Sequence, residues 1–288
     1  QLLAFAKKEG IGIRAFSGSG NEAMITIEDY LDAFAVDALT RTVLLYIESV
    51  KNGRRFVSAA REVSRQKPVI VLKGGRTREG NKAAESHTGA LAANNRVFEA
   101  ACRQAGVVLV EHPMDLIDVS AAFSSLPLPR GNRVGIATLG GGWGVVAADL
   151  CVEHGLELAP LSPDLIARID RILPPYWSRS NPVDLVGEAD VTVPLRVMEE
   201  MMRWDGCDAY IHMGVMGRRI MVQWLAESAT AVDPSQNKAL IKERLQKVVD
   251  YEKFFLESMV RLMEKYGKPI LGVYLLTDEK SRTITDVE

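Results

Sequence analysis

The sequence predicts an α/β protein with two consecutive units, each built on a parallel sheet. Short apolar runs alternate with helix-like stretches along the chain, a pattern typical of parallel sheets with helices on both faces. The length of 288 residues suits two domains at roughly 150 residues each. Residues 124–133 contain two prolines and a glycine at a helix-to-strand transition. We therefore predict domains over residues 1–128 and 129–288.

Each unit has its own set of expected elements. In the first we expect strands over residues 11–16, 42–48, 68–74 and 107–111, and helices over 28–37, 54–66 and 94–104. In the second we expect strands over 133–139, 156–161, 209–216 and 269–276, and helices over 145–154, 162–173, 193–204 and 237–266. Residues 1–10 are typical of the last turns of a helix that ends at Gly10. We interpret the chain as an internal piece of a longer protein.

Composition and charge exclude several classes of protein. Hydrophobic residues make up 47% and charged residues 25%, and the formal net charge is −2. This balance argues against broad electrostatic binding of nucleic acid or of an anionic membrane. The cysteines Cys102, Cys151 and Cys207 lie far apart, so we expect neither a disulfide framework nor a zinc site. We expect no membrane span, no signal peptide and a cytoplasmic location.

His87 is the first candidate for chemistry. It follows a stretch, Gly74–Glu85, that we expect to be a loop and that contains Arg76, Arg78 and Lys82. Such a loop is longer than most connections between a strand and a helix, and it suits an anionic substrate. Neutral imidazole is a good nucleophile near pH 7. Taken alone, a loop histidine is more often an ordinary surface residue, and we treat His112, His154 and His212 as structural.

Glu48 and two glycine-rich segments are further candidates. Glu48 ends an apolar strand, where a carboxylate can orient a histidine ring. Gly141, Gly142, Trp143 and Gly144 follow a strand and open a helix, so backbone N–H groups there can bind phosphate. Gly20 and Asn21 also precede a helix, although turns of this composition are common. Each of these features also has a purely structural interpretation.

Together these motifs resemble one known family. The segments 18–22, 45–48, 67–73, 86–89, 131–134, 141–144 and 181–185 are similar to the nucleoside-diphosphate-forming acyl-CoA synthetases, relatives of ADP-forming acetyl-CoA synthetase and succinyl-CoA ligase. The resemblance covers nearly the whole chain, and its most specific part is Ser86-His87-Thr88-Gly89. It implies two consecutive flavodoxin-like, doubly wound domains, the first truncated at its N-terminus.

The family resemblance also implies a reaction. Acyl-CoA and phosphate give an acyl phosphate, whose phosphoryl group passes to a histidine and then to ADP. His87 matches the phosphorylated histidine, Glu48 the glutamate that orients it, and Gly141–Gly144 a loop that faces the phosphate. In the reverse direction, an acid, CoA and ATP give acyl-CoA.

The resemblance implies partners that this chain lacks. A CoA-binding domain and an ATP-grasp domain, fused or separate, would complete an enzyme that uses Mg²⁺, ATP or ADP, and CoA and that forms oligomers. We expect no cofactor or metal bound by this piece, a small acid or acyl-CoA as substrate, and no turnover by the piece alone. Trp143 departs from the smaller residue or proline often found there in the family.

Three other functions remain open. The same architecture can serve as a non-catalytic regulatory module fused to a protein acetyltransferase, and His87 with Glu48 argues for the active ligase instead. A ligand-binding module without chemistry would bind nucleotide or CoA without phosphorylation of His87. A redox flavodoxin would show flavin absorbance.

Overall fold

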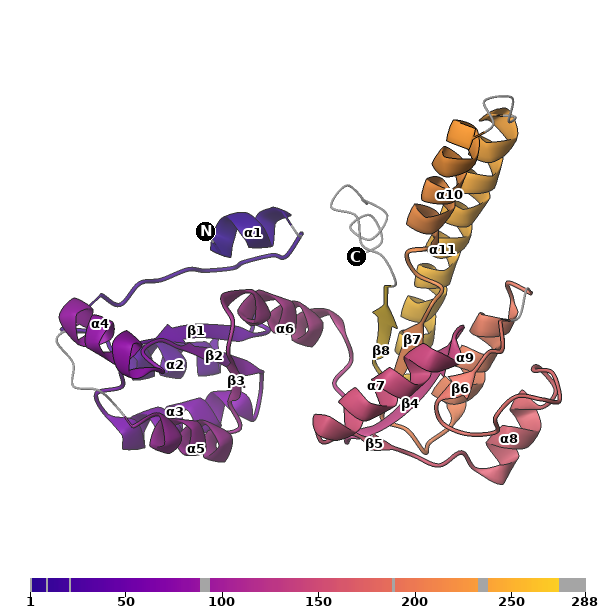
Figure 1. Ribbon diagram of the computed structural model, residues 1–288. Coiled ribbons are helices and arrows are strands. Elements are labelled where there is room, and N and C mark those ends of the chain that lie inside the picture. The colour runs from indigo at the N-terminus through magenta and orange to yellow at the C-terminus, as the bar shows by residue number, and fades with distance from the viewer. Residues whose placement is uncertain are drawn as a thin grey trace. The chain divides into compact units, whose positions relative to one another are not determined.

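The computed structural model describes residues 2–8, 10–20, 22–88, 94–187, 190–232 and 238–274 (Figure 1). The chain divides into two compact units, Gln1–Ser125 and Leu126–Glu288. We describe each unit by itself. Both are α/β structures with parallel strands, so the predicted fold class is confirmed. The predicted domain limits at residue 128 remain a prediction.

Unit 1 contains a three-stranded parallel sheet in the order β1-β2-β3. Its elements are α1 (Leu2–Lys8), α2 (Ile27–Val36), β1 (Val43–Ile47), α3 (Gly53–Ser64), β2 (Val69–Lys73), α4 (Arg78–Thr88), α5 (Asn95–Ala105), β3 (Val108–Val110) and α6 (Pro113–Ser125). Val43 lies opposite Val69, and Ile70 lies opposite Val108. The parallel register brings the carboxyl ends of β1 and β2 to the same edge.

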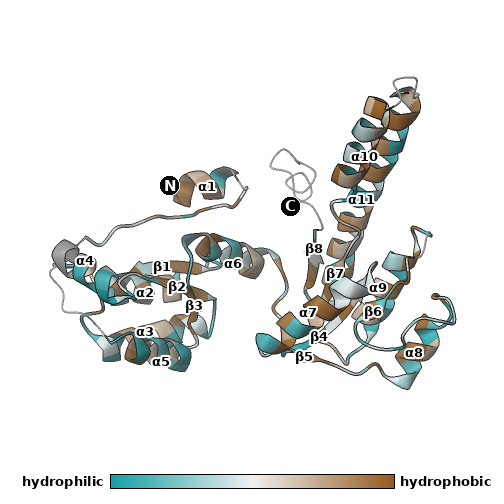
Figure 2. Ribbon diagram, viewed as in Figure 1, coloured by the Kyte–Doolittle hydropathy of each residue, from teal (hydrophilic) through white to brown (hydrophobic). Residues whose placement is uncertain are grey.

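Helices cover both faces of this sheet. On one face, strand residues such as Leu45 and Val71 pack against Phe56 of α3 and Phe98 of α5. On the other, Ile70 and its neighbours pack against α6. The strands are coloured brown in Figure 2 because their residues are apolar, as expected for a sheet buried on both faces.

Two expectations for unit 1 are wrong. Residues 11–16 form no strand, because this segment has no partner in the sheet and its residues from Gly12 to Phe16 are exposed. The expected loop Gly74–Glu85 becomes helical at Arg78, because Thr77 caps the helix and accepts a hydrogen bond from the Gly80 N–H at 3.0 Å. The sequence analysis placed the end of a helix near residue 124 but gave no bounds for α6.

Unit 2 contains a five-stranded sheet in the order β5-β4-β7-β8, with β6 also paired to β4. Its elements are β4 (Arg133–Thr138), α7 (Gly141–Glu153), β5 (Glu157–Leu158), α8 (Pro163–Ile169), β6 (Val183–Asp184), α9 (Val193–Arg203), β7 (Ala209–Met213), α10 (Arg218–Val232), α11 (Lys238–Tyr266) and β8 (Ile270–Val273). All strand pairs are parallel. The sequence analysis missed β6 and α10, and the expected strand 156–161 is reduced to two residues.

Asn181 completes the edge of β4 between two very short neighbours. β5 pairs with β4 at Arg133 and Val134, and β6 pairs with it at Ala137 and Thr138. Between these pairings, the Asn181 side chain accepts the Ile136 N–H at 3.0 Å and donates to the Val134 carbonyl at 2.7 Å. Asn181 also donates to the Ala159 carbonyl at 3.0 Å, so its amide ties three backbone groups together.

The two faces of the unit 2 sheet are covered differently. On one face a large core of buried residues from α8, α9 and α11 packs against strand residues such as Tyr210 and Ile270. On the other face, Ala147 and Cys151 of α7 pack against Ile136 and Met213. No helix in the described ranges is both long and apolar enough to cross a membrane.

His212 is completely buried in β7 and gives a testable pH dependence. Burial lowers its pKa to about 3, so the folded protein holds it neutral while the unfolded chain protonates it near pH 6.5. The unfolded state therefore binds more protons between these values, and stability falls as the pH drops below about 6.5. We expect this group to contribute a slope of about 1.4 kcal/mol per pH unit, which His212→Gln should remove.

Urea unfolding at pH 7 and pH 5 measures this slope. His154→Gln, at an exposed histidine of the same unit, serves as the control and should keep the wild-type pH dependence. Equal slopes in the wild type and in His212→Gln would contradict the prediction.

Candidate functional site

The carboxyl edge of the unit 1 sheet brings together Tyr46, Glu48, Lys73 and Gly74. Ile47 and Lys73 are paired at the ends of β1 and β2, so the residues that follow them meet at one edge. Ligands of open parallel sheets bind beyond the carboxyl ends of strands. Glu48, a predicted site residue, lies at this edge and is half-buried.

Lys73 fixes the backbone of this edge. Its ammonium group donates to the Glu48 carbonyl at 2.6 Å and to the Gly74 carbonyl. Burial lowers the pKa of Lys73, and the Glu48 carboxylate acts in the opposite direction. The sequence analysis did not assign Lys73 this role, because a strand-end lysine gives no sign of pointing inward.

Tyr46 and Gly74 hold the Glu48 side chain. The Tyr46 hydroxyl donates to Glu48 Oε1 at 3.2 Å, and burial followed by the Glu48 charge raises the pKa of Tyr46. A Cβ at Gly74 would lie 2.7 Å from the Tyr46 hydroxyl oxygen and 3.3 Å from Glu48 Cγ. A side chain at position 74 would therefore displace the Tyr46 ring from Glu48, so glycine allows this contact, and Glu48 is a positioned carboxylate.

His87 belongs to the last turn of α4, the helix that follows this edge. Only two glycines, Arg76 and Thr77 separate β2 from the start of α4. Arg76 is anchored beside β3, because its guanidinium donates to the Glu111 carbonyl at 2.7 Å. The backbone is described through Thr88, whereas the side chain of His87 lies outside the described residues, and its catalytic role stays a prediction.

Gly20 does not open a helix. It has φ +55°, a conformation that favours glycine, and nothing lies within 4 Å of a Cβ added there. The next helix, α2, begins only at Ile27, where Thr26 and Asp29 form a capping box. The predicted partner Asn21 lies outside the described residues.

In unit 2, the predicted glycine loop opens α7 directly after β4. Gly140 is the N-cap residue, and the helix starts at Gly141. The Thr138 hydroxyl donates to the Gly140 carbonyl at 3.0 Å and accepts the Gly140 N–H at 3.2 Å, which holds the turn. The sheet connections diverge at β4, with β5 on one side and β7 on the other, and crevices at such positions commonly bind ligands.

Some positions of the loop are closely packed against neighbouring residues, and others are open to solvent. A Cβ at Gly144 would lie 3.0 Å from Thr138 Cγ2, so glycine allows α7 to approach β4. Nothing lies within 4 Å of a Cβ at Gly142. The Trp143 side chain is 57% exposed. The first N–H groups of α7 are thus presented by residues without bulky side chains, except at Trp143.

Asp184 is a residue of this site that sequence reasoning did not assign. Its Oδ1 accepts the Val186 N–H at 2.8 Å, while its Oδ2 would lie 2.5 Å from a Cβ at Gly141. A carboxylate therefore lies against the positive end of α7, a favourable position for a negative charge. The motif 181–185 had been noted without a role for Asp184, and only the pairing of β6 with β4 reveals this contact.

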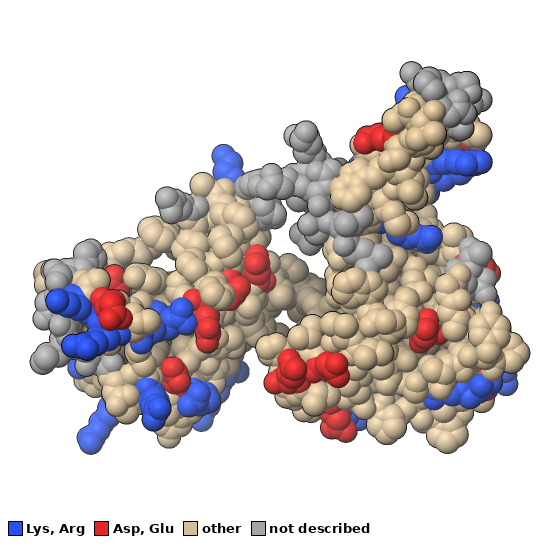
Figure 3. Space-filling view, viewed as in Figure 1, with Lys and Arg blue, Asp and Glu red and all other residues tan. Residues whose placement is uncertain are grey.

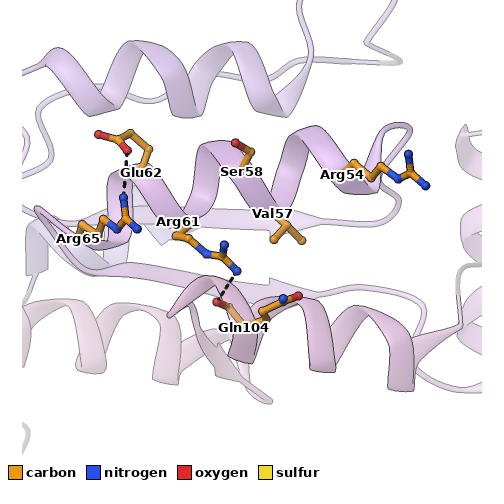
Figure 4. A pocket seen from close by; sticks show the side chains of 7 residues that line it. All are labelled: Arg54, Val57, Ser58, Arg61, Glu62, Arg65 and Gln104. Atoms are coloured by element: carbon orange, nitrogen blue, oxygen red, sulfur yellow. Dashed lines mark hydrogen bonds and ion pairs between the residues drawn. The ribbon is translucent and has the colours of Figure 1, made fainter.

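A separate groove of about 400 Å³ runs along α3 and α5 (Figure 4). It is lined by Arg54, Val57, Ser58, Arg61, Glu62, Arg65 and Gln104. Basic side chains gather over this part of unit 1 in Figure 3. Protein groups already engage two of its arginines, because Arg61 donates to the Gln104 carbonyl and Arg65 pairs with Glu62 at 3.8 Å. We assign this groove no ligand.

The three cysteines are buried and do not contribute reactive thiolates. Burial raises the pKa of Cys102 to about 11 and also raises the pKa values of Cys151 and Cys207. Thiols with raised pKa values stay protonated and react slowly.

The two units match known domains in sequence. Residues 1–123 match the succinyl-CoA ligase-like flavodoxin domain, and residues 134–226 match the ligase-CoA domain. The acetate–CoA ligase [ADP-forming] I subunit alpha of Pyrococcus furiosus is 44% identical over 189 residues, which is 66% of this chain and 41% of that protein. The acetate–CoA ligase [ADP-forming] of Methanocaldococcus jannaschii is 40% identical over 188 residues, 65% of this chain and 27% of that protein.

The chain also matches a solved structure over almost its full length. The dinucleotide-forming acetyl-coenzyme A synthetase 1 of Ca. Korarchaeum cryptofilum, in complex with phosphate and ADP, has a TM-score of 0.78 and 27% identity. The match covers 99% of this chain and 56% of that one. The chain belongs to the ADP-forming acyl-CoA synthetase family. The resemblance stated from the motifs is thus confirmed.

The chain spans only part of the length of its relatives. It covers 41% and 27% of the two curated relatives above, and 34% of the 4-hydroxybutyrate–CoA ligase [ADP-forming] of Nitrosopumilus maritimus, to which it is 31% identical.

The role of Lys73 at the edge of the unit 1 sheet can be tested by Lys73→Met. The change keeps the length of the side chain but leaves the Glu48 and Gly74 carbonyls without their ammonium donor. We expect the free energy of unfolding to fall by about 2 kcal/mol, as for other lost hydrogen bonds to charged groups. Urea unfolding measures this loss, and Lys7→Met, at an exposed lysine of α1, should change stability by less than about 0.5 kcal/mol. Equal effects of the two variants would contradict the role of Lys73.

Proposed function

We propose that this chain is the central, phosphohistidine-bearing part of an ADP-forming acyl-CoA synthetase. The whole enzyme would interconvert acyl-CoA, ADP and phosphate with a carboxylic acid, CoA and ATP. The observation that carries the proposal is the presence of both matching domains in order, in a chain similar to ligases named as ADP-forming. Glu48, held by Tyr46 at the carboxyl edge of unit 1, supports it.

In this proposal, His87 carries the phosphoryl group. Phosphate displaces CoA from acyl-CoA, which gives an acyl phosphate and free CoA. A ring nitrogen of His87 then attacks the phosphorus, the bond to the acyl oxygen breaks, and the carboxylate leaves. The terminal phosphate oxygen of ADP attacks phosphohistidine to give ATP and return the histidine.

The other predicted site residues support this transfer. Glu48 orients the His87 ring and stabilises its positive charge when the ring is phosphorylated. The N–H groups of Gly141, Gly142, Trp143 and Gly144 bind phosphate oxygens at the start of α7, and Gly20 and Asn21 offer further backbone donors. The negative charge of the Asp184 carboxylate repels phosphate at the start of α7, so we expect phosphate to bind there only transiently.

The complete enzyme would need groups that this chain does not contain. We propose a CoA-binding domain and an ATP-grasp domain, in the same polypeptide or in a partner subunit, with CoA, ATP or ADP and Mg²⁺ supplied there. The relative solved with phosphate and ADP supports a nucleotide partner for the family. We further propose an oligomeric assembly, a small acid or acyl-CoA as substrate, and a cytoplasmic location.

Labelling of the complete enzyme tests this function. The full-length polypeptide, with any partner subunit, is incubated with γ-labelled ATP and Mg²⁺. We expect label on the protein that is lost in acid, retained in base and discharged by added ADP. If folded protein binds nucleotide but takes up no label, the ligase proposal fails and the non-catalytic regulatory module replaces it.

A further inference from the structure

α10 and α11 form a hairpin that extends beyond the strands of unit 2 (Figure 1). α11 has 29 residues, which corresponds to about 43 Å of helix. The match to the ligase-CoA domain ends at residue 226, so the end of α10 and the whole of α11 lie outside the matched range. We call this hairpin the arm. The matched domain therefore does not account for it.

The two helices of the arm differ in the chemistry of their exposed residues. The exposed part of α11 is largely charged, and some of these groups are paired, as Lys247 is with Glu243 at 2.7 Å. Six charged residues of α11 are exposed between positions 242 and 253: Lys242, Glu243, Arg244, Lys247, Asp250 and Lys253. Among the residues of α10, all of which the structure describes, Glu227 alone is both charged and exposed.

The exposed residues of α10 form an apolar stripe. Met221, Trp224, Leu225, Ser228 and Val232 follow the i, i+3, i+4, i+7, i+11 spacing, so they share one side of the helix. Trp224, Leu225 and Val232 are 56%, 61% and 88% exposed, and Met221 is 39% exposed. We name these five residues the α10 stripe.

The remaining residues of α10 lie on other sides of the helix. Ala226 and Thr230 are half-buried on the side opposite the stripe, where α10 packs against α11. Glu227 lies outside the stripe and accepts a hydrogen bond from the Gln223 amide at 2.9 Å. No charge therefore interrupts the stripe. At ordinary side-chain sizes it exposes roughly 500 Å² of apolar area, near the upper end of what monomers present.

Large and small residues occupy different halves of this side of α10. Trp224 and Leu225 lie in the first half, whereas Ser228, Ala229 and Ala231 lie in the second. When two such helices run antiparallel and cross at Ser228, Trp224 of each copy lies opposite position 232 of the other, and Leu225 lies opposite Ala231. Each large side chain then meets a smaller one, as dense packing requires. A parallel pair would place Trp224 against Trp224 and leave a gap at Ser228.

We propose that the α10 stripe packs antiparallel against the α10 stripe of a second copy of this chain, about a two-fold axis at Ser228. A two-fold axis uses the same surface on both copies, so the interface has to be complementary to itself, as the stripe is. Two stripes would bury up to roughly 1,000 Å², the area at which specific interfaces begin. The proposal gives the oligomer proposed above an interface, and it depends on no step of the ligase reaction.

Sedimentation velocity of the full-length polypeptide, with any partner subunit, tests the pairing over a dilution series. Leu225→Lys puts a charge into the stripe and leaves the core intact, because Leu225 is exposed in the single chain. We expect this variant to halve the mass of the assembly and to raise the Kd for self-association by at least about a hundredfold. Val97→Lys makes a similar change at a 65% exposed valine of α5 and should leave the mass unchanged.

Cysteine crosslinking tests the geometry of the pair. The three native cysteines are buried, so an added cysteine provides the accessible thiol. In Ser228→Cys the two new thiols meet at the axis, and we expect mild oxidation to join two copies through a disulfide. In Met221→Cys, seven residues earlier on the same side of α10, the two thiols would lie about 21 Å apart along the helix axis. We expect that variant to form no more covalent dimer than the wild type.

Several results would overturn this pairing. A single copy at every dilution, an unchanged mass for Leu225→Lys, or no disulfide at position 228 would show that the stripe does not join two copies. Equal crosslinking at positions 221 and 228 would show a parallel pair, and a disulfide from position 228 to a different protein would assign the stripe to that protein. Phosphoryl labelling of His87 has no part in these measurements, so failure of the pairing and failure of the ligase proposal can be told apart.

Discussion

His87→Ala is expected to abolish phosphoryl labelling of the full-length enzyme and to lower ATP formation from acyl-CoA, ADP and phosphate by at least about a thousandfold. Removal of the nucleophile leaves no group to accept the phosphoryl from the acyl phosphate, and losses of this size follow removal of nucleophiles elsewhere. Initial rates of ATP formation and autoradiography of the labelled protein measure the two effects.

Two companion variants make the His87 result specific. His112→Ala removes an exposed histidine of the same unit and should leave labelling and rate unchanged. Glu48→Gln keeps the side-chain shape but removes the charge that orients the ring, so we expect label to form about a hundredfold more slowly while the protein stays folded. Label that persists in His87→Ala would show that another residue carries the phosphoryl group.

Gly141→Ala is expected to disrupt the start of α7. The added methyl group would lie 2.5 Å from Asp184 Oδ2, and the carboxylate is already fixed by the Val186 N–H. Either the Asp184 side chain rotates away and gives up its hydrogen bond to the Val186 N–H, or α7 shifts, at a cost of about 1–3 kcal/mol, which corresponds to a fall in Tm of roughly 2–12 °C for a unit of this size. Because the same N–H groups are proposed to bind phosphate, we also expect a loss of at least tenfold in kcat.

Gly142→Ala is the matched control for this prediction. It changes the neighbouring glycine in the same turn, where nothing lies within 4 Å of the new methyl group. Alanine favours the helix over glycine, so Tm should stay constant or rise slightly. Differential scanning calorimetry and steady-state rates of both variants give the comparison. Equal losses in the two variants would show that the loop is sensitive to any side chain and not to the contact with Asp184.

Most of the strands could be predicted from the sequence because a buried parallel strand is apolar throughout. β1, β2, β4, β7 and β8 all fall within the expected strand segments. The segment 11–16 is similarly apolar but is not a strand, because strand formation also needs a neighbouring strand to bond with. β6 was missed because two residues carry no periodic pattern.

The candidate site was predictable where it depends on position along a strand, and less so where it depends on contacts. Glu48 and Gly141 were found because each lies directly after a strand that the sequence marks clearly. The inward-pointing Lys73 and the contact of Asp184 with Gly141 join residues 25 to 43 positions apart. Such contacts depend on the order of the strands in the sheet, and the local composition of the sequence does not determine that order.

Asn181 has a consequence for how this protein tolerates change. The Asn181 side chain bonds to β4 between its pairings with β5 and β6, so this edge of β4 has hydrogen-bond partners along its length. The connection from β5 to β6, which contains α8, is therefore held to the sheet at its end by the side-chain amide of Asn181 and not by a long strand pairing. Insertions or deletions in this connection can be absorbed without shifting Asp184 or the start of α7, provided that Asn181 is kept. The length of the connection between β5 and β6 can thus vary while the position of Asp184 beside α7 stays the same.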